Sequence, residues 1–173
     1  MSDSTGSIRI YGDPVLRKKA EPVAEVDDDI RDLAEHMIDA MFDNVGLGLA
    51  APQVGVSKRL IVIDTSFGED EEHILVLINP ELIETEGEIS MQEGCLSVPG
   101  VFEELVRPEI ITVGFVDTDG RKLKIKAEGM MSRVIQHEMD HLEGVLFVDR
   151  LSTVKRSLLA NTLKSMAEDG IET

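Results

Sequence analysis

The stretch His137-Glu138-Met139-Asp140-His141 constrains this chain more than any other part of its sequence. On an α-helix, residues four positions apart lie on the same face, so His137 and His141 can bind one metal ion. Glu138 is then close enough to exchange a proton with a water on that ion. Two unrelated histidines are the alternative, but the chain has only 4 histidines and two of them fall at this spacing. The pattern therefore predicts a metal-binding helix, which we expect to begin near Glu128.

Two histidines do not complete a catalytic metal site, which commonly has three protein ligands and one open position. The spacing H-E-x-x-H-x-x-G-x-x-H, which would supply a third histidine, is excluded because Phe147 stands at its last position. A downstream glutamate would have to be Glu168 or Glu172, both in a polar segment. Cys95, the only cysteine, is the better candidate. A lone cysteine is more often a small buried apolar residue, but its thiolate would complete a Cys/His/His site.

Composition limits the class of protein. The 173 residues suit one catalytic domain, residues 1–173, of which the small polar residues 1–7 are expected to be disordered. The net charge of −17 opposes direct binding to DNA or to an anionic membrane surface. One cysteine fits a reducing compartment, and neither a membrane-spanning run nor a leader-like N-terminal segment is present. We therefore expect a cytoplasmic location.

The expected strands are apolar or alternating runs bounded by turn residues. Asn79-Pro80 is expected to end one of them, and the Thr-Asp-Gly turn at residues 118–120 predicts a hairpin. These strands cover residues 60–64, 74–78, 82–89, 110–116 and 122–126.

Helices are expected on either side of these strands. Residues 27–42 carry apolar side chains at the helical period after an acidic first turn, and Ser152 or Thr153 can cap a final helix. Because strands cluster between helices, we predict an α+β fold. Its mostly antiparallel β-sheets should pack around the central metal-binding helix, with an N-terminal amphipathic helix and a C-terminal helix.

Three motifs follow one another in the chain: residues 46–53 read Gly-Leu-Gly-Leu-Ala-Ala-Pro-Gln, residues 93–97 read Glu-Gly-Cys-Leu-Ser, and residues 136–142 read Gln-His-Glu-Met-Asp-His-Leu. In this order and spacing they resemble the peptide deformylase family over almost the whole chain. The resemblance implies a hydrolase that removes the N-formyl group from the N-terminal formylmethionine of newly synthesised proteins and releases formate.

The resemblance also implies roles for residues of these motifs. A metal-bound water would attack the formyl group while Glu138 acts as general base and then as general acid. Gln53 and the backbone N–H of Leu96 would stabilise the oxyanion. The metal ligands would be Cys95, His137 and His141.

For substrate binding, the resemblance implies a methionine-sized pocket and an extended peptide added antiparallel to a strand. Arg133 and Phe102 stand at positions that vary within the family, and we expect the Arg133 side chain at the pocket rim. The implied pocket walls and backbone partners are Gly46, Leu47, Gly48, Met91, Val134 and His137.

The family's metal is typically Fe²⁺, and Zn²⁺, Ni²⁺ or Co²⁺ can occupy the site; the residues themselves select none of them. The expected partners are N-formylmethionyl nascent peptides. A transient ribosome contact through the final helix stays open, because its basic residues are followed by Glu168, Asp169 and Glu172.

Other interpretations remain at this point. An ordinary metallopeptidase would share the helix motif but not the cysteine and glutamine motifs, and a structural metal domain would need a fourth protein ligand. Arg107 could pair with Glu93 or Asp140 and fix the cysteine loop, or form a surface ion pair of little consequence.

Overall fold

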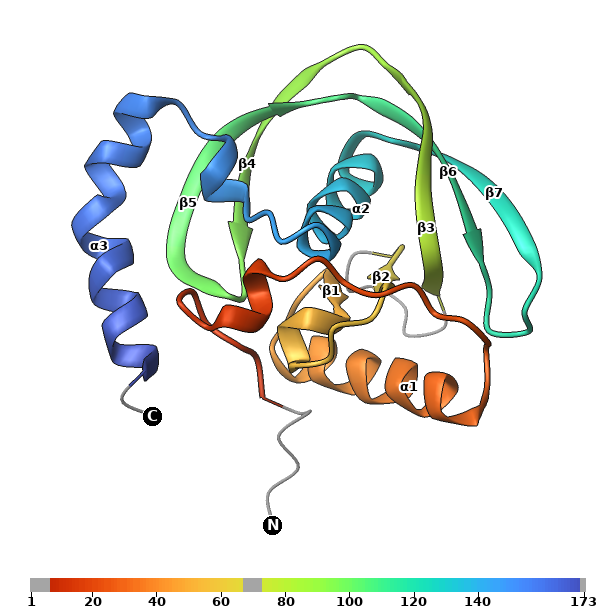
Figure 1. Ribbon diagram of the computed structural model, residues 1–173. Coiled ribbons are helices and arrows are strands. Elements are labelled where there is room, and N and C mark those ends of the chain that lie inside the picture. The colour runs from red at the N-terminus through yellow and green to blue at the C-terminus, as the bar shows by residue number, and fades with distance from the viewer. Residues whose placement is uncertain (1–6, 67–72, 172–173) are drawn as a thin grey trace.

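The computed structural model describes residues 7–66 and 73–171 (Figure 1). Of the segment predicted to be disordered, only Ser7 lies among these residues. No helix in this described part is long and apolar enough to cross a membrane.

Three α-helices stand at the predicted places: α1 (Asp28–Asp43), α2 (Gly129–Leu142) and α3 (Thr153–Ile171). Asp27 caps α1 by accepting a hydrogen bond from the N–H of Ile30. Ser152 does the same for α3, where its hydroxyl accepts from the N–H of Lys155 at 3.2 Å. Short 3-10 helices fill some of the connections: η2 (Pro14–Arg17), η3 (Ala51–Val54) and η4 (Phe147–Arg150).

The strands form two antiparallel sheets, which confirms the predicted α+β class. The five-stranded sheet has the order β1-β2-β3-β6-β7, and β4 pairs with β5 in a separate two-stranded sheet. The strands are β1 (Gly48–Ala50), β2 (Leu60–Asp64), β3 (Ile74–Glu86), β4 (Ile89–Cys95), β5 (Val98–Arg107), β6 (Ile110–Val116) and β7 (Lys122–Glu128).

The prediction that Asn79-Pro80 ends a strand is wrong. β3 continues through both residues, and its register against β6 shifts after Ile78. Asn79 adopts a left-handed φ of 51°, and its side-chain amide makes two hydrogen bonds to the backbone of Val23, at 2.8 and 2.9 Å. A proline is tolerated here because the register shift removes the need for its missing N–H.

The predicted strand over residues 82–89 is also two separate pieces. Its first part belongs to β3, Gly87 turns the chain at a φ of 66°, and Ile89 begins β4. The pair β4–β5 was not predicted, because Gly94 interrupts β4 and Pro99-Gly100 interrupts β5.

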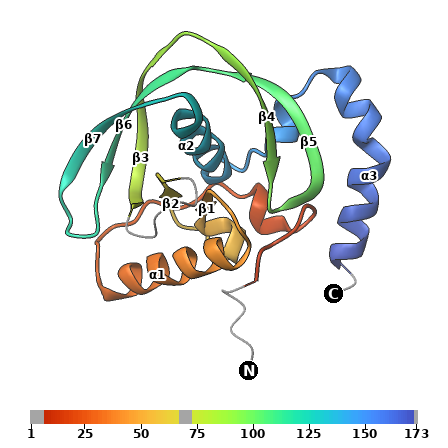
Figure 2. The same ribbon diagram turned by 180° about the vertical axis from the view of Figure 1, so that it is seen from behind.

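The five-stranded sheet separates two apolar cores. Side chains of β2 alternate between them: Ile61 and Ile63 pack with α2, whereas Leu60 and Val62 pack with α1. Figures 1 and 2 show α2 enclosed beneath the arch of β3, β4, β5 and β6, with α1 on the opposite side of the five-stranded sheet. Helix α2, which carries the predicted metal ligands His137 and His141, is therefore the central element.

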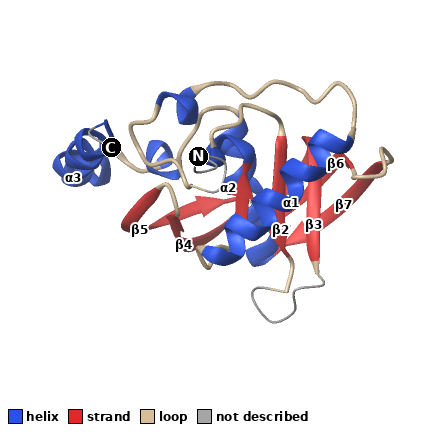
Figure 3. Ribbon diagram, turned by 90° about the horizontal axis from the view of Figure 1, so that it is seen from below, coloured by secondary structure: helices blue, strands red, loops and turns tan. Residues whose placement is uncertain are grey.

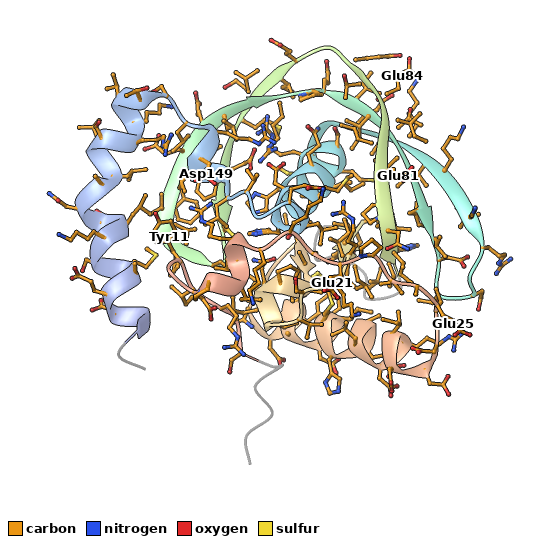
Figure 4. The ribbon with its side chains drawn as sticks, viewed as in Figure 1. Tyr11, Glu21, Glu25, Glu81, Glu84 and Asp149 are labelled. Atoms are coloured by element: carbon orange, nitrogen blue, oxygen red, sulfur yellow. The ribbon has the colours of Figure 1, made fainter. Side chains whose placement is uncertain are left out.

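Helix α3 lies beside β5 at the edge of the molecule, away from α2 (Figure 3). Its Leu159, Leu163 and Met166 pack into a third cluster with β5 and η4, while Val154 and Leu158 are exposed. Much of the negative charge lies on the surface, where Glu21, Glu25, Glu81 and Glu84 are exposed (Figure 4).

Candidate metal centre

Three side chains from two distant parts of the chain meet beneath the arch. Cys95 ends β4, and His137 and His141 stand one turn apart on α2. One potential ligand atom from each lies within 4.8 Å of the other two. The Cys95 sulfur is 3.4 Å from His141 Nε2. The structure thus brings together the residues that the sequence predicted as ligands.

This donor set fits a divalent transition-metal ion. A thiolate and an imidazole that share one tetrahedral ion, with bonds of about 2.3 and 2.1 Å, stand roughly 3.6 Å apart, close to the observed sulfur–nitrogen separation. His141 Nδ1 and Glu138 Oε1 are buried without a hydrogen-bond partner. Sulfur and imidazole donors suit iron, zinc, nickel and cobalt, and not calcium or magnesium. In the described part of the chain, no further cysteine, histidine or carboxylate joins these three residues as a fourth ligand.

The electrostatic environment also favours a cation. Burial lowers the pKa of His141 well below its usual value, which keeps the ring neutral, the form that binds metals. Burial lowers the pKa of His137 too, but the nearby Cys95 and Glu93 raise it more, so its pKa lies well above normal. The negative field that would hold a proton on His137 would equally attract a metal ion.

Glu93 orients the first histidine. Its Oε1 lies 2.9 Å from His137 Nδ1, which leaves Nε2 of that ring to face the metal position. The same carboxylate accepts two hydrogen bonds from Arg107, at 2.5 and 3.0 Å, and one from Arg133. Burial alone would raise the pKa of Glu93, but hydrogen bonds from His137 and Arg107 lower it to about 2. Glu93 is therefore a buried carboxylate.

Arg107 continues this network away from the metal. Its side chain is only 4% exposed, and its Nη1 donates to Asp140 at 3.0 Å. Arg150 donates two further hydrogen bonds to Asp140, both of 2.7 Å. Arg107 thus pairs with both predicted partners and ties the cysteine strand to the metal helix, rather than forming a surface ion pair.

The expectation that Arg133 lies at the pocket rim is wrong. Its side chain is buried, bonds to Glu93, and donates to the carbonyl of Ile89 at 2.7 Å. Sequence reasoning missed this role, and it also missed Phe147, whose ring centroid is 5.9 Å from that of His137. The periodic pattern of α2 places Arg133 one turn before His137, but it cannot reveal a partner on β4.

Glu138 faces the metal position from the same helix. Burial raises its pKa to about 7, and a neighbouring cation would favour its ionised form. Gln53 contacts the cysteine end of the site. Its Oε1 accepts from the N–H of Ala50, and its Nε2 donates to the Ser97 hydroxyl at 3.1 Å and lies 3.7 Å from the Cys95 sulfur. The amide is thereby held with its N–H group beside the candidate ligands.

A cavity of about 620 Å³ opens onto these groups. Of the predicted substrate contacts, Met91 is not among the residues that line it, although its neighbour Gln92 is. The predicted site residues that do line it are Gly46, Leu47, Gly48, Gln53, Cys95, Leu96, Val134, His137 and Glu138.

Strand β1 borders this cavity as an edge strand. Within the five-stranded sheet it pairs only with β2, and the carbonyl of Leu47 accepts from the N–H of Asp64. Because hydrogen-bonded positions alternate in an antiparallel ladder, the N–H and C=O of Gly48 point away from β2. A Cβ at Gly48 would lie 2.8 Å from Val134 Cγ1 and 2.9 Å from Glu138 Oε2, so only glycine allows this close approach.

The chain is similar to known proteins along most of its length. The sequence profile of the polypeptide deformylase family matches residues 6–157. A peptide deformylase of Thermodesulfovibrio yellowstonii is 48% identical over 158 residues, which cover 91% of this chain and 96% of that protein. One of Acidobacterium capsulatum is 47% identical over 92% of this chain and 94% of its own length.

Solved structures show the same similarity in three dimensions. The peptide deformylase of Plasmodium falciparum superposes with a TM-score of 0.91 at 36% identity, covering 96% of this chain and 98% of that one. The enzyme of Thermus thermophilus gives a TM-score of 0.86 at 43% identity, covering 94% and 98%.

Proposed function

Given that this chain belongs to the polypeptide deformylase family and removes the N-formyl group from nascent peptides, we propose that Cys95, His137 and His141 hold its metal ion and that Glu138 moves the protons. The observation that carries the proposal is the meeting of one sulfur and two imidazoles beside a buried carboxylate. We take the whole chain as one catalytic domain acting in the cytoplasm.

A metal ion bound there supplies Lewis acidity, which lowers the pKa of a coordinated water toward neutrality. We propose Fe²⁺ as the native ion, with Zn²⁺, Ni²⁺ or Co²⁺ able to replace it, because thiolate and imidazole ligands suit all four. A thiolate on a redox-active ion is exposed to oxidation, so an iron-loaded protein should lose activity in air.

The residues around the ion transfer protons and stabilise the developing negative charge. Glu138 accepts a proton from the attacking water and later returns it to the leaving amine, which releases formate and a free N-terminus. Gln53 Nε2 and the backbone N–H of Leu96 donate to the formyl oxygen as it gains negative charge. Loss of one such donor costs about 3 kcal/mol of transition-state stabilisation in comparable sites.

The substrate peptide extends the sheet at β1. The outward-facing N–H and C=O of Gly48 can pair with an extended backbone. The C=O of Gly46 is the next partner, because the N–H of Gly46 donates to Met41. Leu47 and Val134 would form the pocket for the methionine side chain, and a part for Met91 in its wall stays a prediction. The nascent chain is the partner we propose, and a ribosome contact through α3 remains open.

Replacement of Glu138 by alanine tests this proposal. Protein loaded anaerobically with Fe²⁺ should release formate from formyl-Met-Ala-Ser, and Glu138→Ala should reduce kcat by orders of magnitude while metal content stays near one ion per chain. A structural metal site would leave Glu138→Ala without effect on any activity. Cleavage of unformylated peptides by the wild-type protein would indicate an ordinary metallopeptidase instead.

A further inference from the structure

Val45 has a backbone conformation that its side chain disfavours. It has a φ of 56°, and within residues 7–66 and 73–171 only one other non-glycine residue, Asn79, has a positive φ. Asparagine tolerates this region, and the Asn79 side chain makes two hydrogen bonds that depend on its position. Valine is β-branched and gains nothing comparable. The conformation at Val45 therefore needs a separate explanation.

The end of α1 imposes this conformation. The N–H of Gly46 donates to the carbonyl of Met41 at 2.9 Å, and the N–H of Val45 donates to that of Phe42 at 3.1 Å. These two bonds form a Schellman motif, in which the left-handed position is usually glycine. A glycine at position 45 would end the helix equally well and without strain. The sequence instead places a large apolar side chain there.

That side chain lies at the mouth of the cavity. Val45 lines the cavity and is 91% exposed. Phe102 lines the same cavity and is 61% exposed, and its ring lies over Gly94, where a Cβ would approach it to 2.5 Å. An exposed, strained apolar residue that lines the same cavity as an exposed aromatic ring is typical of a binding surface rather than of a folding contact.

The path of the substrate leads past Val45. The formyl end must lie near Glu138, which Gly48 approaches closely. The chain cannot continue toward Ala50, because that residue is fully buried, whereas Gly46 is only partly buried. It must therefore run antiparallel to β1, from Gly48 toward Gly46, so that its third residue lies beside Gly46 and Val45.

We propose that Val45 is a specificity-determining residue that contacts the third residue of the formylated peptide and favours an apolar side chain there. The inference rests on the proposed function. Strain at the end of α1 is tolerated because the valine provides apolar contact that glycine lacks. Phe102 bounds the same part of the cavity from β5.

The test compares kcat/KM for formyl-Met-Ala-Leu and formyl-Met-Ala-Ser in four proteins: wild type, Val45→Gly, Val45→Asn and Leu158→Ala. The wild type should favour the leucine peptide by about fivefold, somewhat below the discrimination of an enclosed apolar pocket. Both Val45 variants should bring the ratio to about 2 or less, since asparagine keeps the left-handed φ without the apolar surface. Val45→Gly should also have an equal or higher Tm. Leu158→Ala, which removes an exposed apolar side chain from α3, should keep the wild-type ratio.

Several results would overturn the proposed role of Val45 in specificity. A wild-type enzyme without preference, an unchanged ratio in both Val45 variants, or an equal fall in Leu158→Ala would overturn the inference. A fall in Val45→Gly alone would assign the effect to backbone flexibility and would overturn it too. Absence of formate release from wild-type protein with formyl-Met-Ala would instead refute the proposed function, independently of Val45.

Discussion

Replacing Glu93 by glutamine should weaken metal binding and destabilise the fold at the same time. The buried carboxylate accepts hydrogen bonds from Arg107, Arg133 and His137. An amide can accept only with its oxygen, and its NH₂ group would face donors. The substitution therefore removes the carboxylate that pairs with the buried Arg133 and leaves Arg107 paired with Asp140 alone.

The size of both effects can be estimated. Removing one partner from a buried ion pair typically costs about 3–5 kcal/mol. For a chain of this length each kcal/mol lowers Tm by roughly 2–4 °C, so the metal-free protein should melt about 6–20 °C lower. The orientation of His137 would also be lost, and loss of such a partner reduces metal affinity by about 10- to 100-fold.

Asp140→Asn is the matched control. It removes one negative charge from the same network, but Asp140 bonds to Arg107 and Arg150 and not to a metal ligand. It should cost about 1–3 kcal/mol of stability, with metal affinity within roughly threefold of wild type, because no ligand loses its hydrogen bond.

The assay combines thermal unfolding of the metal-free proteins with competition for Zn²⁺ or Co²⁺ against a chelator. Equal losses of metal affinity in Glu93→Gln and Asp140→Asn would refute the reasoning, since the effect would then not act through His137. Unchanged affinity in Glu93→Gln would refute it as well.

Two further predictions concern the packing around the site. Gly48→Ala should lower kcat for formate release at least about tenfold with metal content unchanged, because the added methyl group would displace the Glu138 carboxylate, and a 1 Å misplacement can cost about 100-fold; wild-type kcat in this variant would contradict the contact. Phe147→Ala removes a fully buried ring and should lower the free energy of unfolding by about 3–5 kcal/mol in denaturant titrations, whereas a loss below about 1 kcal/mol would mean that the site collapses around the missing ring.

The fold was predictable where sequence periodicity is local. Apolar or alternating runs located β2, β6 and β7, the 3.6-residue period located α1, and the spacing of His137 and His141 indicated α2. The separation of β4 from β3 and the continuation of β3 through Asn79-Pro80 were not predictable. Both depend on bulges and turns that are stabilised by residues elsewhere in the chain, such as Val23 beside Asn79.

The candidate site, like the fold, was predictable from the sequence only in part. The sequence by itself indicated the candidate donor set, because the spacing of His137 and His141 on one helix face is a local property and the chain has a single cysteine. Only the tertiary structure decided that Arg133 is buried against Glu93 and that the edge strand β1 borders the cavity beside the candidate ligands. Local spacing fixes which side chains share a face, whereas contacts between distant segments depend on how whole helices and sheets pack together.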